Sequence, residues 1–243
     1  MDTWTTSHER VLARRSAGGW MFLLEAARDL RATGAVAPSS RRLGKLLTDR
    51  VREESGRALT VLEAGAGSGA ITRVLLPLIG PGSRLDVVDS NPRFVGHLRH
   101  LVDAHPAPAG HHERVHVHQA RIEHFDVPRR YDAIVSGLPF TNFDPAQVAA
   151  IMDRYLELLH PGGTLTYFAY RGTRLARSLL ASRSEARRHR EVEQVLAAYQ
   201  RRHAVGRWTV WGNLPPADVW QLRAPAAVPA ADSAAEGRLI TSR

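Results

Sequence analysis

Cysteine is absent from the 243-residue chain, which excludes disulfide bonds, thiolate catalysis and thiolate zinc sites. The chain contains 12 histidines, but they show no H-E-x-x-H pattern or comparable ligand spacing. We therefore expect no metal site.

Long hydrophobic runs are also missing. No apolar stretch approaches the roughly 20 residues that a helix needs to cross a bilayer. The first residues lack the charged-then-apolar layout of a signal peptide. We therefore expect a cytoplasmic protein, with or without peripheral attachment to the inner face of the membrane. A chain of this length can form one large domain with its own core.

Lysine is nearly absent, because Lys45 is the only one and almost all positive charge comes from arginine. The formal net charge of +9 favours polyanionic partners or anionic surfaces. Charge alone does not distinguish nucleic acid from anionic lipid headgroups, so both kinds of partner stay open at this point.

The most distinctive stretch of the chain is glycine-rich and spans residues 60–76 (TVLEAGAGSGAITRVLL). A short apolar run leads to Glu63, glycines follow at every second position (Gly65, Gly67, Gly69), and an apolar helical pattern then begins. This order predicts a strand, a tight turn and a helix, with a turn so bare that a ligand can approach the backbone. A glycine turn without any ligand is the alternative.

Glu63 distinguishes two classes of cofactor. Gly65, Gly67 and Ala70 also satisfy the dinucleotide fingerprint G-x-G-x-x-G/A, and Asp89 lies at the spacing of a ribose-binding acid. A carboxylate two residues before the first glycine would repel a pyrophosphate, however. It suits a cation, and S-adenosylmethionine carries both a sulfonium and an ammonium. E-x-G-x-G-x-G followed by an acid at the next strand end resembles the nucleotide-binding half of Rossmann-like methyltransferases.

Two further strand ends supply candidate cofactor-binding residues. Residues 84–89 (RLDVVD) predict a strand that ends at Asp89, which we expect to bind the ribose hydroxyls; a surface helix cap is the alternative. Strand 115–118 leads to Gln119, where many methyltransferases have an acid that receives the adenine amino group. A glutamine carbonyl can accept the same hydrogen bond without the charge.

Strand and helix patterns alternate along the chain, and segments 208–211 and 219–222 predict a closing hairpin. This order indicates an α/β protein with a Rossmann-like methyltransferase fold, in which a doubly wound, mostly parallel seven-stranded sheet has an antiparallel last strand. We divide the chain into an N-terminal helical lid or membrane-associating segment (1–47), a methyltransferase domain that binds S-adenosylmethionine (48–223) and a disordered tail (224–243).

Three helical segments lie outside this alternation. Residues 20–30 (WMFLLEAARDL) are amphipathic and predict either an interfacial membrane helix or a lid over the cofactor cleft. Residues 34–47 predict a turn and a helix that Ser39 or Ser40 can cap, with free N–H groups near the cleft. Residues 171–202 are helical in pattern and densely basic, which indicates either a solvated face or a headgroup-binding surface.

The sequence SGLPF (136–140) follows a predicted strand, 131–135, at the edge of the sheet where the methyl acceptor must lie. Adenine N6-methylating enzymes, including the rRNA dimethyltransferases, carry N-L-P-Y/F here. Their polar first residue accepts a hydrogen bond from the amine, and the aromatic ring stacks on the flipped base. This chain has Gly137 at the polar position, with Ser136 as a partial substitute, which argues against a nucleobase acceptor.

Several stretches together resemble the bacterial phospholipid N-methyltransferases, which methylate phosphatidylethanolamine. APSS, SGLP and NLPPA-x-VW are far more specific than the glycine motif, and Gln119 departs from the family's usual acid. The resemblance implies transfer of methyl groups from S-adenosylmethionine to an amine, the ethanolamine headgroup of a phospholipid. A small-molecule or peptide N-methyltransferase is the alternative, with an rRNA adenine N-methyltransferase behind it. The matching stretches are 34–43, 61–76, 87–94, 136–140, 160–171 and 211–220.

This reading yields two sets of candidate site residues. The expected cofactor-binding residues are Ser39, Ser40, Glu63, Gly65, Ala66, Gly67, Gly69, Asp89, Ser90, Asn91, Gln119, Ala120 and Ser136. The expected residues on the acceptor side are Ser136, Gly137, Leu138, Pro139, Phe140 and Tyr170.

The mechanism that we expect is direct displacement, in which a neutral amine attacks the sulfonium methyl group and needs little beyond alignment and exclusion of water. The aromatic faces of Phe140, Tyr170 and Trp20 are candidates for cation–π attraction to the methylated ammonium. No residue is a convincing general base, so water takes the proton, and arginines hold the lipid phosphate.

Overall fold

The computed structural model describes residues 38–106, 112–170, 183–211 and 216–226. Within them, seven strands form a single sheet in the order β3-β2-β1-β4-β5-β7-β6. Neighbouring strands from β3 to β5 are parallel, whereas β7 runs antiparallel to both β5 and β6. The strands are β1 (Thr60–Ala64), β2 (Arg84–Asp89), β3 (Val115–Gln119), β4 (Tyr131–Ser136), β5 (Leu159–Tyr170), β6 (Ala204–Val210) and β7 (Ala217–Arg223).

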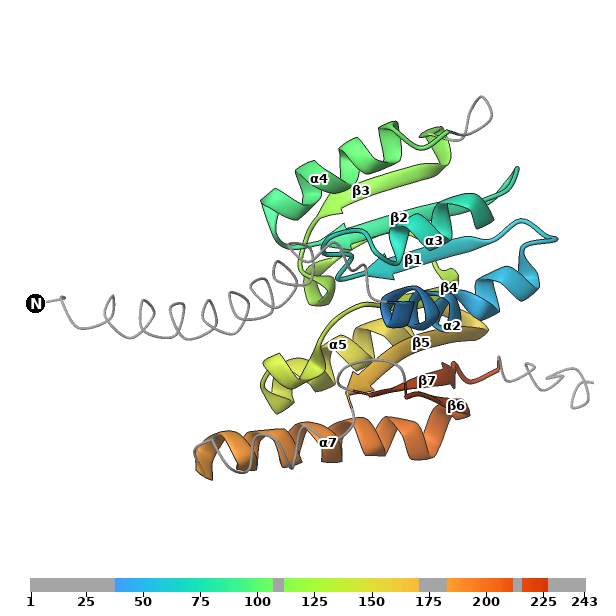
Figure 1. The fold of residues 1–243 in the computed structure, drawn as a ribbon. Helices are drawn as coiled ribbons and strands as arrows, with labels where there is room; N and C mark the ends of the chain where they lie inside the picture. The colour runs from blue at the N-terminus through green and yellow to red at the C-terminus, as the bar shows by residue number, and fades with distance from the viewer. Residues whose placement is uncertain (1–37, 107–111, 171–182, 212–215, 227–243) are drawn as a thin grey trace, which may run out of the picture.

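This sheet confirms the expected fold class, a mostly parallel seven-stranded α/β sheet with an antiparallel last strand, and the closing hairpin of β6 and β7. The strand order reverses between β1 and β4, whose carboxyl ends lie side by side. In open α/β sheets, ligands bind at such a switch point. The carboxyl ends of the parallel strands point to the left in Figure 1.

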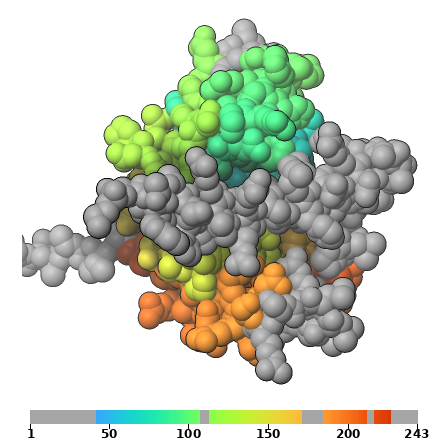
Figure 2. Space-filling model, turned by 90° about the vertical axis from the view of Figure 1, so that its left-hand side faces the viewer, coloured from blue at the N-terminus to red at the C-terminus, as the bar shows by residue number. Residues whose placement is uncertain are grey.

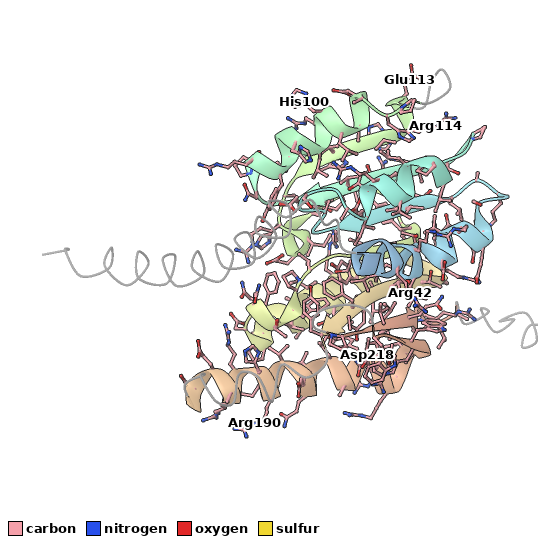
Figure 3. The ribbon with its side chains drawn as sticks, viewed as in Figure 1. Arg42, His100, Glu113, Arg114, Arg190 and Asp218 are labelled. Atoms are coloured by element: carbon pink, nitrogen blue, oxygen red, sulfur yellow. The ribbon has the colours of Figure 1, made fainter. Side chains whose placement is uncertain are left out.

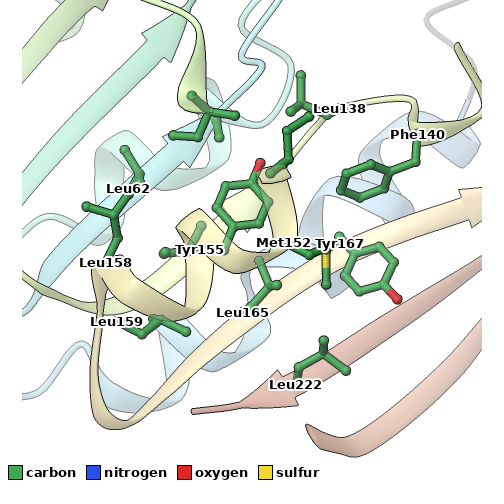
Figure 4. Close-up of a cluster of buried hydrophobic side chains, with 14 of the residues drawn as sticks. Leu62, Leu138, Phe140, Met152, Tyr155, Leu158, Leu159, Leu165, Tyr167 and Leu222 are labelled. Atoms are coloured by element: carbon green, nitrogen blue, oxygen red, sulfur yellow. The ribbon is translucent and has the colours of Figure 1, made fainter. Parts of the chain in front are cut away.

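Helices cover both faces of the sheet. Apolar side chains of α2 (Pro38–Glu54), α3 (Thr72–Leu75) and α4 (Pro92–Asp103) pack in one buried cluster with β1 and β2. Those of α5 (Pro145–Leu158) and α7 (Arg183–His203) pack in a second cluster on the opposite face, part of which Figure 4 shows. Because apolar residues fill both faces, the three central strands β1, β2 and β4 are almost continuously buried.

Polar caps fix where helices α4 and α5 begin. The Asn91 side chain accepts a hydrogen bond from Arg93 N at the start of α4 (3.0 Å). The Asp144 side chain accepts one from Gln147 N at the start of α5 (2.8 Å). In both helices a proline follows the cap, at a position where its missing N–H costs no intrahelical bond.

Helix α2 corrects one expectation about the N-terminal segment. It begins at Pro38, so Ser39 and Ser40 lie in its first turn and not at the capping position. The helix is continuous across the boundary expected between residues 47 and 48, and Leu47 and Val51 are both buried in the domain core.

The C-terminal boundary also differs from the expectation of a disordered tail from residue 224. Ala224 is buried, and its N–H donates to the carbonyl oxygen of Gly163 (2.9 Å). Pro225 O accepts a hydrogen bond from Gly162 N (3.3 Å), so pairing with the β5 segment continues past β7. The expectations for residues 20–30, 171–182 and 227–243 fall outside the described residues. No helix among the described residues combines the length and apolar character needed to cross a membrane.

A buried carboxylate, Asp86, links β2 with β3 and β4. It accepts hydrogen bonds from Arg84, from Tyr131 Oη (3.0 Å) and from the ring of His118 (2.7 Å). Burial alone would raise the pKa of Asp86, but these donors hold it well below its ordinary value. His118 therefore has a structural partner, and no group of three metal-ligating side chains forms anywhere in the described parts of the chain.

Candidate active site

The glycine-rich turn between β1 and α3 is left-handed at three positions. Gly65, Gly67 and Gly69 have φ values of 70°, 55° and 76°, which residues with a side chain rarely adopt. Gly65 N donates to Val88 O (2.8 Å), which ties the turn to the end of β2. A Cβ atom at Gly67 would meet no atom within 4 Å, so this part of the turn faces open space.

Two of the expected site segments, the glycine turn and SGLPF, are in direct backbone contact. Gly137 N donates to Ala64 O (2.8 Å). A Cβ atom at Gly137 would lie 2.7 Å from Gly65 O, and one at Gly65 would lie 2.3 Å from Leu138 Cδ2. At Gly137 the clash is with backbone, and at Gly65 the φ of 70° adds to the contact with a leucine side chain, so both positions favour glycine. The absence of a polar side chain at Gly137 thus has a structural cause.

Asp89 lies at the carboxyl end of β2, only 4% exposed. Its Oδ2 accepts a hydrogen bond from Gly67 N and its Oδ1 accepts one from Asn91 N, both at 2.8 Å. Burial raises the pKa of Asp89, and the two backbone donors partly oppose this. The carboxylate is therefore held in one orientation, and each oxygen keeps a lone pair for a further donor such as a sugar hydroxyl.

Glu63 is fully buried in β1, and within the described structure neither carboxylate oxygen has a hydrogen bond of normal geometry, although Thr72 acts on it as a weak donor. Burial raises its pKa to about 8, an effect that Thr72 in the first turn of α3 partly offsets and that Asp89 strengthens. A carboxyl group of this kind is costly unless a cation or a donor reaches it. Such an unpaired acid beside a bare glycine turn fits the positively charged part of S-adenosylmethionine.

A cavity of about 430 Å³ opens at the carboxyl ends of β1, β2, β3 and β4. Figure 2 views the molecule from this edge of the sheet. Five of the expected site residues line the cavity: Gly65, Asp89, Ser90, Ala120 and Leu138. The structure thus brings together the glycine turn, the acid, the segment after β3 and the SGLPF loop.

Three expected acceptor-side residues, Ser136, Phe140 and Tyr170, are engaged in packing instead. The Ser136 side chain is buried and accepts hydrogen bonds from Tyr155 Oη (2.9 Å) and Leu138 N (3.3 Å). Phe140 is buried edge-to-face against Tyr167, with ring centroids 5.4 Å apart. Neither residue lines the cavity, so Ser136 is a poor substitute for the missing polar residue and Phe140 offers no open aromatic face.

Tyr170, at the end of β5, packs edge-to-face on Phe168 with ring centroids 5.1 Å apart, and burial raises its pKa. It does not line the cavity.

The other expected cofactor residues support the site or lie beside it. Asn91 caps α4, and Ala66 is buried in the core. A Cβ atom at Gly69 would lie 2.8 Å from Leu101 Cδ1, so this glycine permits close packing of the turn on α4. Gln119 is exposed. Besides Ser136, Phe140 and Tyr170, the expected residues with described side chains that are absent from the cavity lining are Glu63, Ala66, Gly67, Gly69, Asn91, Gln119, Gly137 and Pro139.

Sequence reasoning missed the residues that complete the wall. Arg121 precedes and Ile122 and Glu123 begin a short helical turn, η3 (Ile122–His124), whereas Asn142 ends and Phe143 follows a similar turn, η4 (Phe140–Asn142). Such short turns have no hydrophobic period that a sequence would reveal. Gln147 was missed as well, although the sequence carries a signal for its position, because D-P-A-Q is a helix-start signature that places it in the first turn of α5.

A larger depression of about 850 Å³ lies at the opposite edge of the sheet, where β1 and β2 begin with Thr60 and Arg84. Its arginines include Arg84, which is paired with Asp86, and Arg154, which is paired with Glu157 (3.0 Å). It is remote from the switch point and from every expected site residue.

Comparison with known proteins agrees with this geometry. Residues 61–163 match the model of a family described as a methyltransferase domain. No curated protein sequence matches the chain.

Similar solved structures include the N-methyltransferase NodS from Bradyrhizobium japonicum WM9, with a TM-score of 0.58 and 23% identity over 78% of this chain and 98% of that chain. The 1,6-didemethyltoxoflavin-N1-methyltransferase of Burkholderia thailandensis has a TM-score of 0.57 and 20% identity, covering 93% of both chains. The magnesium protoporphyrin IX methyltransferase of Synechocystis PCC 6803 has a TM-score of 0.57 and 11% identity, covering 76% of this chain and 80% of that chain.

The matched domain and the fold define the class of protein: the chain is a methyltransferase that uses S-adenosylmethionine. The matched residues include the glycine turn, Asp89 and the SGLPF loop, so the region of the match contains the cavity.

The contact between the glycine turn and the SGLPF loop predicts the effect of Gly137→Ala. The added methyl group must push the loops apart, so we expect a loss of about 1–3 kcal/mol in unfolding free energy, as for other overpacked sites. Gly96→Ala is the matched control, because Gly96 lies inside α4 with nothing within 4 Å of its Cβ position. It should gain about 0.5–1 kcal/mol from helix propensity. Urea unfolding measures both, and equal stability of the two variants would contradict the loop contact.

Glu63 predicts a pH dependence of stability. Burial keeps its carboxyl group protonated in the folded protein up to a pKa of about 8, whereas in the unfolded chain its pKa is near the ordinary value of 4.5. The unfolded state therefore binds fewer protons between these values, and stability falls as pH rises, by at most about 1.4 kcal/mol per pH unit. Glu63→Gln should lack this loss, so its stability advantage over the native protein should grow from pH 5 to pH 8.

Urea unfolding at several pH values tests this. Glu157→Gln is the control, because Glu157 is a surface residue with a side chain 64% exposed. Parallel stability profiles for Glu63→Gln and the native protein would mean that Glu63 is ionised in the fold.

Proposed function

We propose that the protein transfers methyl groups from S-adenosylmethionine to the nitrogen atom of an amine. The observation that carries this proposal is the lining of the cavity, where Asp89 and Gly65 of the cofactor side meet Leu138 of the SGLPF loop. Solved structures of similar fold include two named as N-methyltransferases, NodS and the toxoflavin enzyme. The steric need for Gly137 supports an acceptor other than a nucleobase, because no amide can stand at that position.

The residues around the cavity suit the parts of the cofactor. Asp89, fixed by two backbone donors, accepts hydrogen bonds from the ribose hydroxyls. Apolar Ala120, Ile122 and Leu138 enclose the flat adenine ring. The bare turn at Gly67 leaves room for the amino-acid part. Glu63 gains a positive partner when the cofactor binds, which favours its ionised form.

The chemistry needs alignment more than proton transfer by the protein. S-adenosylmethionine supplies a methyl group on a positively charged sulfur. The acceptor must be a neutral amine, and its proton leaves to water after the methyl group has transferred. Glu123, a carboxylate in the cavity wall, is paired with Arg121 (2.6 Å), so its Oε1 already has a partner within the chain. The chain itself contributes orientation of the two reactants and exclusion of water.

The acceptor that we favour is the ethanolamine headgroup of a phospholipid, on the resemblance of APSS, SGLP and NLPPA-x-VW to phospholipid N-methyltransferases. Exposed tryptophans support it. Trp208 is 44% and Trp211 70% exposed, at the carboxyl end of β6. Because β6 runs parallel to β5, this end lies at the same edge of the sheet as the cavity. Tryptophan favours the boundary between water and lipid.

Helix α7 adds positive charge at this edge. Figure 1 shows that its amino-terminal half extends beyond the carboxyl ends of the strands. Arg187, with a side chain 77% exposed, and Arg190 lie in this half, and Figure 3 shows Arg190 on the side that faces away from the sheet. Arg187 pairs with Glu191 (2.8 Å), which reduces its contribution. A peripheral contact with anionic lipid fits this arrangement.

A small-molecule amine is the second candidate. One of the structures of similar fold supports it, because that enzyme is a 1,6-didemethyltoxoflavin-N1-methyltransferase. An enzyme of this kind would keep the cofactor side of the cavity and have no affinity for vesicles.

Radiolabelled S-adenosylmethionine distinguishes the candidates when the protein is incubated with phosphatidylethanolamine vesicles, rRNA and a pool of small amines in parallel. We expect label in the lipid fraction, rising with pH as more amine becomes neutral. Label confined to the small amines would replace the lipid by a soluble acceptor. Label in rRNA would refute the argument from Gly137.

Trp211→Ala tests the membrane contact. We expect it to weaken sedimentation with vesicles that contain anionic lipid by about threefold to tenfold, because an interfacial aromatic side chain is lost. Val205→Ala is the control, since Val205 is 51% exposed at the amino end of the same strand, on the opposite edge of the sheet. If both variants sediment like the native protein, β6 does not face the lipid.

A further inference from the structure

Asn142 is a polar residue of the cavity wall that neither sequence motif identifies. It ends η4 (Phe140–Asn142), the short turn between β4 and α5, and it lines the cavity together with Asp89 and Leu138. Gly67 and Asn91 hold Asp89, Tyr155 donates to Ser136, and Arg121 pairs with Glu123. These polar groups of the site all have hydrogen-bond or ion-pair partners, unlike the side-chain amide nitrogen of Asn142.

The amide nitrogen of Asn142 is buried and has no hydrogen-bond partner within the described structure. An amide N–H that has left water and found no acceptor is unfavourable, and such groups in native proteins call for an explanation. Here the amide belongs to the wall of a ligand cavity, so an acceptor on the ligand would satisfy it.

The surrounding wall indicates which part of the ligand this is. Apolar Ala120, Ile122, Leu138 and Phe143 line the same cavity, and such side chains suit the faces of a flat ring. Asp89 is an acceptor and suits the hydroxyls of a sugar. A purine ring carries three nitrogen atoms that accept hydrogen bonds, and Asn142 supplies a donor for one of them.

Gln119, the residue expected to bind adenine, is less suited to this role. It ends β3 opposite Asp89, but its side chain is exposed and does not line the cavity.

We propose that Asn142 donates a hydrogen bond to a ring nitrogen of the adenine of S-adenosylmethionine and determines the preference of the site for this base. The proposal rests on the assignment of the cavity to the cofactor's adenosine. It adds a base-reading residue that follows the SGLPF motif and does not depend on the identity of the methyl acceptor.

Calorimetric binding of S-adenosylhomocysteine and its 1-deaza, 3-deaza and 7-deaza analogues tests this without any methyl acceptor. Each analogue replaces one ring nitrogen by C–H and leaves the rest of the ligand unchanged. We expect the native protein to bind one of the three analogues about threefold to tenfold more weakly than S-adenosylhomocysteine, as loss of one neutral hydrogen bond predicts.

Asn142→Ala, combined with the analogues, gives a double-mutant cycle in which one change is in the protein and the other in the ligand. The variant should bind S-adenosylhomocysteine about threefold to tenfold more weakly and should no longer distinguish it from that one analogue. Asn142→Ser, which keeps a donor, should restore part of the difference. Gln119→Ala is the comparison, and it should bind S-adenosylhomocysteine and all three analogues as the native protein does.

Three results would overturn the proposal. Native protein that binds all three analogues equally well has no hydrogen bond to a ring nitrogen, whatever the stability of the variants. If Asn142→Ala still binds the one analogue as much more weakly than S-adenosylhomocysteine as the native protein does, another residue makes the hydrogen bond. Native protein that fails to bind S-adenosylhomocysteine at millimolar concentration would refute the assignment of the cavity itself, which distinguishes that failure from a wrong role for Asn142.

Discussion

The glycine turn after β1 and the SGLPF loop after β4 are joined by a contact between two backbones. A Cβ atom at Gly137 would lie 2.7 Å from Gly65 O, and the Leu138 side chain packs directly against Gly65. This contact closes the switch point between β1 and β4 and sets one wall of the cavity. The glycine turn is therefore shaped by the neighbouring loop as much as by the ligand that it is built to receive.

Two buried carboxyl groups near this contact differ in how they are stabilised. Asp89 is satisfied by backbone N–H groups before any ligand arrives, so its orientation is fixed in advance. Glu63 has no such partners and is destabilising in its charged form. Asp89 is thus oriented in advance, whereas Glu63 would gain a partner only if a cation approached it. In the function proposed above, the positively charged cofactor supplies that partner, which a pyrophosphate could not.

The sequence was informative wherever function depends on backbone and strand order. Glycines at every second position predicted the tight turn. The strand pattern of residues 84–89 predicted that Asp89 lies at the end of the next strand. Side-chain orientation was less accessible. Ser136 and Phe140 follow a strand whose last residues are buried, and only tertiary packing shows that Tyr155 and Tyr167 engage them. Asn142 and Phe143 lie in turns without a periodic pattern, and Ala224 is ordered by hydrogen bonds to a distant segment.

Helix α2 has a practical consequence for dividing the chain into parts. Because Leu47 and Val51 of one continuous helix are both buried against the sheet, a cut at residue 48 would remove part of the core along with the helix start. A shortened protein for crystallisation or calorimetry should keep α2 whole and begin no later than Pro38. At the other end, it should extend through Pro225, whose carbonyl group is paired with Gly162.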